Sequence, residues 1–117
     1  MIQSATVTIT GAATGYIGSR IHGKILAIKA VENTNANPTL TITGETSGIP
    51  VLTVAGVTKD ATTWYHPRAL ANHNDDGAAA TDVAVEVPIL NERIKVVVSV
   101  AATGTSAITV YYETEPY

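Results

Sequence analysis

Apolar and polar residues alternate with a period of two along most of this chain. The clearest early example is the run ATVTIT at residues 5–10, in which apolar side chains alternate with three threonines. Two later runs repeat the pattern at residues 39–43 and 94–100. Such alternation is typical of a β-strand with one face buried and the other exposed to solvent. We therefore predict half-buried strands at all three places.

Two further runs place apolar residues at every second position, at residues 83–89 and 108–112. Between the runs lie clusters of turn-forming residues, namely NTNANP, GETSG, AGVTKD, HNDDGAAATD, LNER and AATGTS. About eight strands with short polar connections predict an all-β fold, an antiparallel β-sandwich or jelly roll. No linker or repeat divides the chain, so residues 1–117 are expected to form a single β-sandwich domain.

The segment at residues 20–31 is compatible with two secondary structures. Ile21, Ile25 and Ile28 recur at helical spacing, which allows an amphipathic helix. The same residues also suit a long strand that is buried on both faces, with Gly23 at a bend. No capping box precedes the segment and its neighbours all have strand patterns, so we prefer the strand.

The stretch GAATGYIG at residues 11–18 raises the question of a nucleotide site. It follows a strand pattern, and Glu32 lies at about the distance expected of the acidic residue in a dinucleotide fingerprint. The glycine spacing, however, differs by one residue from the dehydrogenase patterns, and a parallel strand would be apolar on both faces. We expect these glycines to form the connection between the first two strands, with no cofactor bound there.

Composition narrows the classes of function. The net charge is −3 with only 7 Lys and Arg residues, which argues against a nucleic-acid surface because such surfaces carry clustered basic residues. There is no cysteine, no apolar run of membrane-spanning length and no signal-peptide pattern, so synthesis in the cytoplasm is expected. Charged residues make up 15% of the chain, below the roughly 25% of ordinary domains, which suits a surface that packs on a partner.

The sequence contains no recognisable catalytic or metal-binding motif. His22, His66 and His73 lack the spacing of zinc ligands, and the run HNDDG lacks the ligand spacing of a calcium loop. No serine stands in a G-x-S-x-G elbow, and the acidic residues fall mostly in predicted turns, where they are expected to be solvated. We expect neither an enzyme nor a metal site.

The densest group of distinctive side chains is TTWYHPRAL at residues 62–70. In one interpretation it is a strand end in which Trp64 packs into the core, Tyr65 faces outward, Pro67 ends the pairing and Arg68 caps a loop. In the other it is a contact anchor, because Trp, Tyr and Arg dominate the energetics of interfaces. The two interpretations are compatible, and both remain open.

The chain termini offer secondary contacts of the same kind. In YYETEPY, Tyr112 is expected to point inward, which leaves Tyr111 and Tyr117 free to contact a neighbour. At the other end, Ile2 lies in a segment, residues 1–10, that is predicted to exchange a strand with a neighbouring copy.

Several of these stretches occur together in one order: GKILAIKAV, TLTITGETSGIPVLTV, TTWYHPRA, a loop with DDG, VPILNERIKVVVSV and GTSAITVYYE. From residue 23 to residue 113 this order resembles a family of small tailed-bacteriophage virion proteins of the capsid decoration or cement type. The specific part is residues 92–98 together with the tryptophan, tyrosine, proline and arginine of residues 64–68. The chain departs from the pattern at residues 15–18 and 78–80.

The resemblance implies a non-enzymatic β-sandwich on the outer surface of an assembled capsid, made in the host cytoplasm. Its implied partners are the major capsid protein and further copies of itself, with a trimer favoured. A head fibre, tail or baseplate component is an alternative. Another is a glycan-binding module in which Trp64 and Tyr65 stack on sugars while His66, Arg68 and Asn72 orient the hydroxyls.

Overall fold

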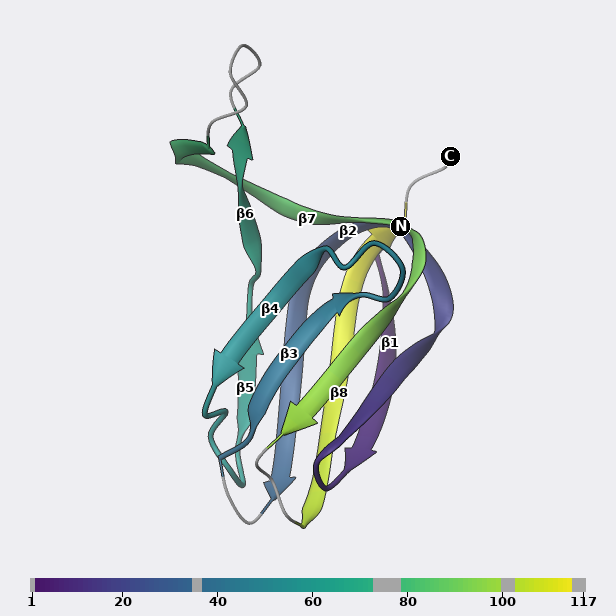
Figure 1. Cartoon of the computed structure of the whole chain (residues 1–117), viewed down its shortest axis with the longest axis vertical. Coiled ribbons are helices and arrows are strands. Elements are labelled where there is room, and N and C mark those ends of the chain that lie inside the picture. Colours follow the sequence, from purple (N-terminus) through teal and green to yellow (C-terminus); the bar gives the residue numbers. More distant parts are fainter. Residues whose placement is uncertain (1, 35–36, 73–78, 100–102, 115–117) are drawn as a thin grey trace.

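The structure is a computed structural model that describes residues 2–34, 37–72, 79–99 and 103–114. All of its regular elements are strands, which confirms the predicted all-β antiparallel fold (Figure 1). The strands are β1 (Ile2–Thr10), β2 (Ala13–Thr34), β3 (Thr39–Gly44), β4 (Pro50–Ala55), β5 (Thr62–Tyr65), β6 (Arg68–Asn72), β7 (Ala79–Ser99) and β8 (Gly104–Thr114).

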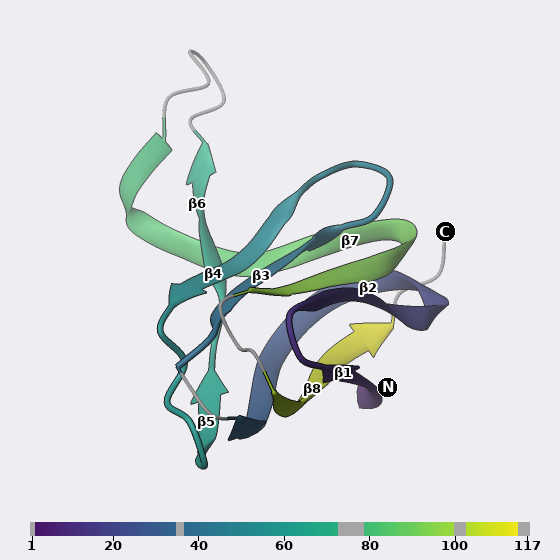
Figure 2. The same ribbon diagram turned by 60° about the horizontal axis from the view of Figure 1, so that its bottom comes forward.

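One continuous sheet folds over itself to make two layers. Its strand order is β1-β8-β2-β7-β3-β4, with β5 added beside β2 and β6 beside β7. The first part of β2 pairs with β7, whereas its second part pairs with β8 and β5. The long strand β2 therefore passes from one layer to the other, as Figure 2 shows. One layer holds β1, β8, β5 and the second part of β2, and the other holds β3, β4, β7 and its first part.

The ambiguous segment at residues 20–31 is part of β2, so the strand interpretation is confirmed. Its helix-like spacing has a local cause. Ile25 pairs with Tyr112 and Ala27 pairs with Tyr111, which leaves Leu26 as an extra residue in a β-bulge. Ile25 and Ile28 are both buried although they are three residues apart, whereas a regular strand would point them to opposite faces. The bulge between them shifts the alternation by one residue.

The structure corrects the predicted connection at residues 11–18. Only Gly11 and Ala12 lie between the strands, with Gly11 at a φ of 66°, and β2 already begins at Ala13. Gly15 lies within β2, where a Cβ would approach the side chains of Val7 and Ile9 to 3.0 Å. Glycine at this position therefore allows β1 and β2 to approach closely between the two layers.

The predicted turn LNER is a second correction. Residues 83–89 and 94–99 belong to a single strand, β7, rather than to two strands. Ile21 pairs with Glu92 and His22 with Leu90, so Asn91 is the extra residue of a bulge, with a φ of 54°. Asparagine tolerates this left-handed conformation better than most residues. The strand bends at Asn91 and continues.

The core lies between the layers and is almost entirely aliphatic. The predicted inward faces of β3, of residues 94–98 and of β8 are confirmed as buried. Val83 and Val85 have no described side chains, and Val100 lies outside the described residues. The buried apolar residues are Ile9, Ile17, Ile21, Ile25, Ile28, Ala30, Leu40, Ile42, Val51, Val57, Val87, Ile89, Ile94, Val96, Val98, Ile108, Val110 and Tyr112.

A two-stranded arm extends beyond the sandwich. It consists of β6 and the first part of β7, paired from Arg68 opposite Glu86 to Asn72 opposite Ala79. Figure 1 shows it projecting away from both layers. The arm is therefore placed to reach surfaces beyond the body of the domain.

Candidate binding surface

Trp64 lies on the outer face of the layer that contains β1, β8 and β5. It is 49% exposed, while Tyr65 is half-buried against the core. This reverses the orientation expected for a simple strand end, in which Trp64 was inward and Tyr65 outward. The pairing with β2 gives the reason, because Tyr65 lies opposite the buried Ile28 and Trp64 opposite the outward Lys29.

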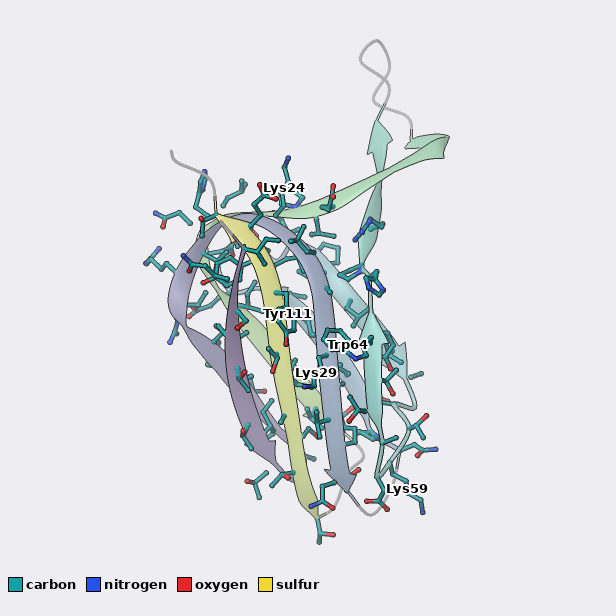
Figure 3. The ribbon with its side chains drawn as sticks, turned by 180° about the vertical axis from the view of Figure 1, so that it is seen from behind. Lys24, Lys29, Lys59, Trp64 and Tyr111 are labelled. Carbon is teal, nitrogen blue, oxygen red and sulfur yellow. The ribbon has the colours of Figure 1, made fainter. Side chains whose placement is uncertain are left out.

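Trp64 has two neighbours on this outer face, Lys29 and Tyr111 (Figure 3). The Lys29 ammonium lies 5.7 Å from the centre of the indole ring, within the range of a cation–π contact. The Tyr111 ring centroid lies 5.4 Å from that of Trp64, with an angle of 31° between the planes. We call Lys29, Trp64 and Tyr111 the Trp64 patch. Its rings are held together before any partner binds.

The rest of this outer face is rich in small polar side chains. Along β1 and β8 the outward positions are mostly serine and threonine, and Thr6 hydrogen-bonds Thr109 at 2.8 Å between their hydroxyl oxygens. Glu113 is exposed at one end of β8. A surface with so few charges is desolvated at low cost when a partner covers it.

Of the remaining predicted contact residues at the termini and on β6, Ile2 and Arg68 are described. Ile2 is 66% exposed at the start of β1 and pairs with Glu113. The Arg68 guanidinium donates to the carbonyl oxygens of Pro67 and Leu26, at 2.7 and 3.4 Å. Tyr117 lies outside the described residues.

The two C-terminal tyrosines differ in the way that the sequence predicted. Tyr112 points inward, is 7% exposed and donates a hydrogen bond to Gln3, as expected of the buried member of the pair. Tyr111 faces outward but is half-buried, because Trp64 covers part of its ring. Trp64 and Tyr111 are thus brought together, whereas Ile2 and Arg68 lie apart from their ring contact.

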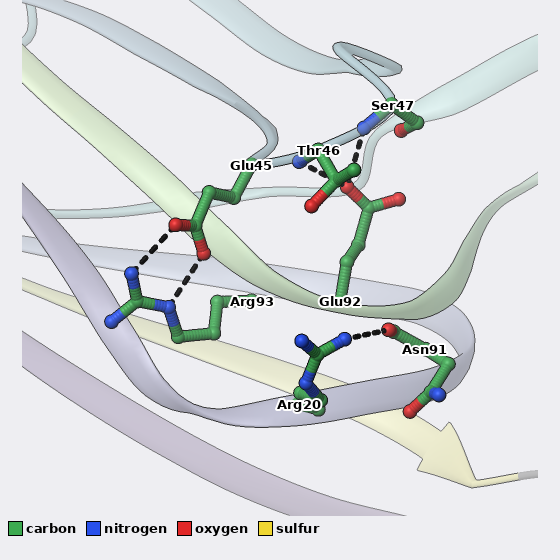
Figure 4. Close-up of polar contacts among 7 residues, drawn as sticks. All are labelled: Arg20, Glu45, Thr46, Ser47, Asn91, Glu92 and Arg93. Atoms are coloured by element: carbon green, nitrogen blue, oxygen red, sulfur yellow. Dashed lines mark hydrogen bonds and ion pairs between the residues drawn. The ribbon is translucent and has the colours of Figure 1, made fainter.

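Two acidic side chains are buried, contrary to the expectation that the acids are solvated. Glu92 is 3% exposed, and its Oε1 accepts hydrogen bonds from the backbone N–H groups of Thr46 and Ser47 at 2.8 and 2.9 Å (Figure 4). Burial raises the pKa of Glu92, but these hydrogen bonds outweigh it, so the pKa lies below its ordinary value. Through these hydrogen bonds the Glu92 carboxylate connects β7 to the turn between β3 and β4.

An exposed ion pair lies beside this buried carboxylate. The Arg93 guanidinium donates two hydrogen bonds to Glu45 in the same turn, at 2.5 and 2.6 Å, and also lies 4.6 Å from the ring centre of Tyr16. The hydrogen bonds from Arg93 hold the pKa of Glu45 below its ordinary range. Arg93 therefore links the turn to the first part of β2.

Glu32 is the second buried acid. It is 3% exposed, its Oε2 accepts a hydrogen bond of 2.6 Å from the Ser106 hydroxyl, and its Oε1 has no partner among the described residues. Burial raises the pKa of Glu32, and the Ser106 hydrogen bond offsets only part of that rise. The alternation within the strands could have revealed both buried acids. Glu32 is four residues from the buried Ile28 and Glu92 is two residues from the buried Ile94, so each acid faces the same side of its strand as that isoleucine.

The described part of the chain contains no group of three His, Cys, Asp or Glu side chains arranged to hold a metal ion, and no pocket. No helix that could cross a membrane occurs within it. His66 is exposed and His22 half-buried, while His73 lies outside the described residues.

Comparison with known proteins gives a likeness in fold. No protein-family model matches the chain, and no curated protein sequence matches it either. A chain from the capsid asymmetric unit of cyanophage Pam1 superposes with a TM-score of 0.50 at 17% identity, covering 98% of this chain and 84% of that one. A chain from disulfide-linked pili, described as Bacillus endospore appendages, gives a TM-score of 0.36 at 18% identity, over 98% and 88% of the two chains. The fold of this chain is thus similar to that of a chain in a phage capsid.

Proposed function

We propose that this chain is a non-enzymatic structural protein of a bacteriophage virion that decorates or cements the assembled capsid. Two lines of support are independent of each other. The order of motifs from residue 23 to residue 113 resembles virion decoration proteins. The fold is similar, over nearly the whole chain, to a chain in the capsid asymmetric unit of cyanophage Pam1.

The observation that carries the proposal is the exposure of Trp64. A tryptophan that is 49% exposed leaves a large apolar area in contact with water, and here the area is enlarged by Tyr111. Its location on a weakly charged sheet face suits a broad contact with another protein. The Trp64 patch, which includes Tyr111, is therefore proposed as the anchor on the capsid, with Tyr65, Arg68, Ile2 and Tyr117 as further proposed contacts.

The projecting arm supports the same function. A two-stranded ribbon without further strands is only marginally stable in water. The arm formed by β6 and the start of β7 has no third strand among the described residues. Contact with a shell would stabilise such an arm.

The partners in this proposal are the major capsid protein and other copies of this chain, at the outer surface of the virion. The same surface properties suit a head fibre, tail or baseplate component, which is the alternative within virion proteins. Location on the particle separates these alternatives.

Co-sedimentation tests the capsid contact. Purified chain is mixed with capsids built from the major capsid protein of the encoding phage, and bound protein is quantified after pelleting. Wild-type chain is expected to saturate at a fixed number of copies per capsid, and Trp64→Ala to bind at least about tenfold more weakly. Leu90→Ala is the matched control, since Leu90 is 58% exposed on β7 and lies outside the Trp64 patch. Equal binding of wild type and Trp64→Ala would show that the Trp64 patch is not the anchor on the capsid.

A glycan-binding module is the second candidate, because an exposed indole ring can stack on a sugar. His66 and Arg68 are exposed nearby in sequence, whereas the side chain of Asn72 is not described. A glycan array distinguishes the two functions. Retention on specific glycans that is lost in Trp64→Ala, together with no binding to capsids, would replace the capsid proposal with this one.

A further inference from the structure

β1 forms one end of the sheet, and its outer edge has no partner strand among the described residues. Its nine residues, IQSATVTIT, pair with β8 without a register shift. The free edge therefore presents a backbone N–H and C=O from every second residue along the whole strand. A long, regular edge of this kind is a template for pairing with another strand.

Outside the projecting arm, three other free edges among the described strands carry features that hinder pairing. β4 begins at Pro50 and has a register shift where it meets β3. β5 has four residues and is soon followed by Pro67. The first part of β2 loses its register after Ile17 and carries an exposed Arg20. β1 has no charge, no proline, no glycine and no bulge. Because soluble proteins normally protect their sheet edges, an unprotected edge indicates an interface.

We propose that β1 pairs antiparallel with β1 of a second copy of this chain, across a twofold axis at Thr6. This is the antiparallel register in which all nine residues of the strand find a partner. It places Thr6 opposite Thr6 of the second copy and Ser4 opposite Thr8. Charge does not oppose this pairing, because β1 contains no charged residue.

The inner face of β1 supports the same arrangement. Ala5 and Val7 pack against the core yet stay half-buried, because β1 is the last strand of its layer. In the proposed register Val7 lies opposite Ala5 of the second copy. Each copy would then cover the apolar side chains that the other leaves open to water, which is favourable.

A twofold pairing closes at two copies, so the inference specifies a dimer in place of the trimer implied by the family resemblance. The two outer layers would join into one surface that carries a Trp64 patch from each copy. The inference rests on the self-association included in the proposed function. The dimer is tested with the isolated chain in solution. The dimer can therefore be disproved while capsid binding is confirmed, and capsid binding can be disproved while the dimer is confirmed.

Disulfide cross-linking tests the register directly, because the natural chain has no cysteine. Directly opposite residues of antiparallel strands have Cα atoms about 4.5–5.5 Å apart, within the range of a disulfide. In Thr6→Cys the two introduced thiols would face each other at the axis. In Ser4→Cys, the control on the same strand and face, they would be about 13 Å apart along the strands. We expect mild oxidation to cross-link Thr6→Cys at least about tenfold faster than Ser4→Cys. Equal or faster cross-linking of Ser4→Cys overturns the register.

Sedimentation equilibrium tests the dimer itself. The wild-type chain is expected to be a dimer in the micromolar range, and Thr6→Lys to raise the dissociation constant at least about tenfold by placing two like charges opposite each other. Thr53→Lys is the matched control, since Thr53 is exposed on β4 at the other end of the sheet. A monomer at high concentration, a trimer, or a dimer that Thr6→Lys leaves unchanged would overturn the proposal.

Discussion

Trp64 and Tyr111 hold their rings 5.4 Å apart although their strands, β5 and β8, lie on opposite sides of β2. On β2, Lys29 is opposite Trp64 and Ala27 is opposite Tyr111. The β2 residue opposite Tyr111 is thus an alanine, which has a small side chain. The rings and Lys29 thus form a contact surface that is ordered in advance, which lowers the entropy cost of binding.

A larger side chain at position 27 of β2 is expected to weaken the proposed contact with the capsid and to leave the fold intact. Ala27→Glu puts a longer, charged side chain beside Tyr111, so it should separate the rings and place a charge in the apolar part of the patch. We expect at least about tenfold weaker binding to capsids. Intrinsic fluorescence of Trp64, the chain's only tryptophan, reports the loss of the ring contact. Thr53→Glu, a charge on the far edge of the sheet, serves as the control and should bind like wild type.

Glu92 is predicted to stabilise the turn between β3 and β4. Glu92→Gln weakens two charge-assisted hydrogen bonds, to the N–H groups of Thr46 and Ser47, so we expect the free energy of unfolding to fall by about 1.5–3 kcal/mol. Urea unfolding measures the change. Glu45→Gln is the control in the same turn, and it should have a much smaller effect because its ion pair with Arg93 is exposed to solvent. Equal effects of the two variants would contradict the role of burial.

The two buried acids, Glu92 and Glu32, are predicted to change the stability of the fold with pH in opposite directions. The pKa of Glu92 is lower in the folded protein than in the unfolded chain, so its stabilisation is present above the ordinary value of 4.5 and is lost as the pH falls through the folded pKa. The pKa of Glu32 is raised on folding, so ionisation of Glu32 destabilises the fold as the pH rises from 4.5 through its folded pKa.

Glu32→Gln tests this sign. The substitution removes a buried charge while keeping the shape of the side chain, so the variant should be more stable than wild type at neutral pH. That advantage should disappear below pH 4.5, where Glu32 is protonated in both states. Urea unfolding at both pH values measures it. An advantage that is the same at both would contradict the predicted ionisation.

Gly23 is predicted to be essential where β2 pairs with the end of β8. A Cβ at this position would lie 1.9 Å from the carbonyl oxygen of Glu113, and a backbone atom cannot move away as a flexible side chain can. We expect Gly23→Ala to cost at least about 3 kcal/mol in the free energy of unfolding. Gly18→Ala in the same strand is the control, since nothing lies within 4 Å of its Cβ position. Similar stabilities of the two variants would contradict this account.

The alternation of apolar and polar residues was enough to predict the fold class and most of the core. In a half-buried strand, successive side chains point to opposite faces, so the buried and exposed faces are visible in the order of residues. The two β-bulges made the pattern harder to interpret: the one at Leu26 left a helix as an alternative to the confirmed strand, and the one at Asn91 led to a predicted turn where the strand continues. At Leu26 the bulge produces a helix-like spacing of isoleucines, and at Asn91 a positive φ resembles a turn although the strand continues.

The candidate surface was only partly predictable. The residue types at positions 64–68 pointed to a contact, but the outward direction of Trp64 depends on its pairing with Lys29, a partner 35 positions away in the chain. The contact between Trp64 and Tyr111 also requires three strands to lie side by side. No local pattern contains that information, since register between distant strands is fixed by the whole sheet.

We propose that this chain sits on a phage capsid and contacts it through the Trp64 patch. Electron cryo-microscopy of intact particles of the encoding phage tests it most directly. We expect density that fits this β-sandwich on the outer capsid surface, with the face that carries Trp64 and Tyr111 against the major capsid protein. In particles that carry Trp64→Ala, that density should be lost. Density for this chain only on the tail, or on the capsid with Trp64 turned to solvent, would contradict it.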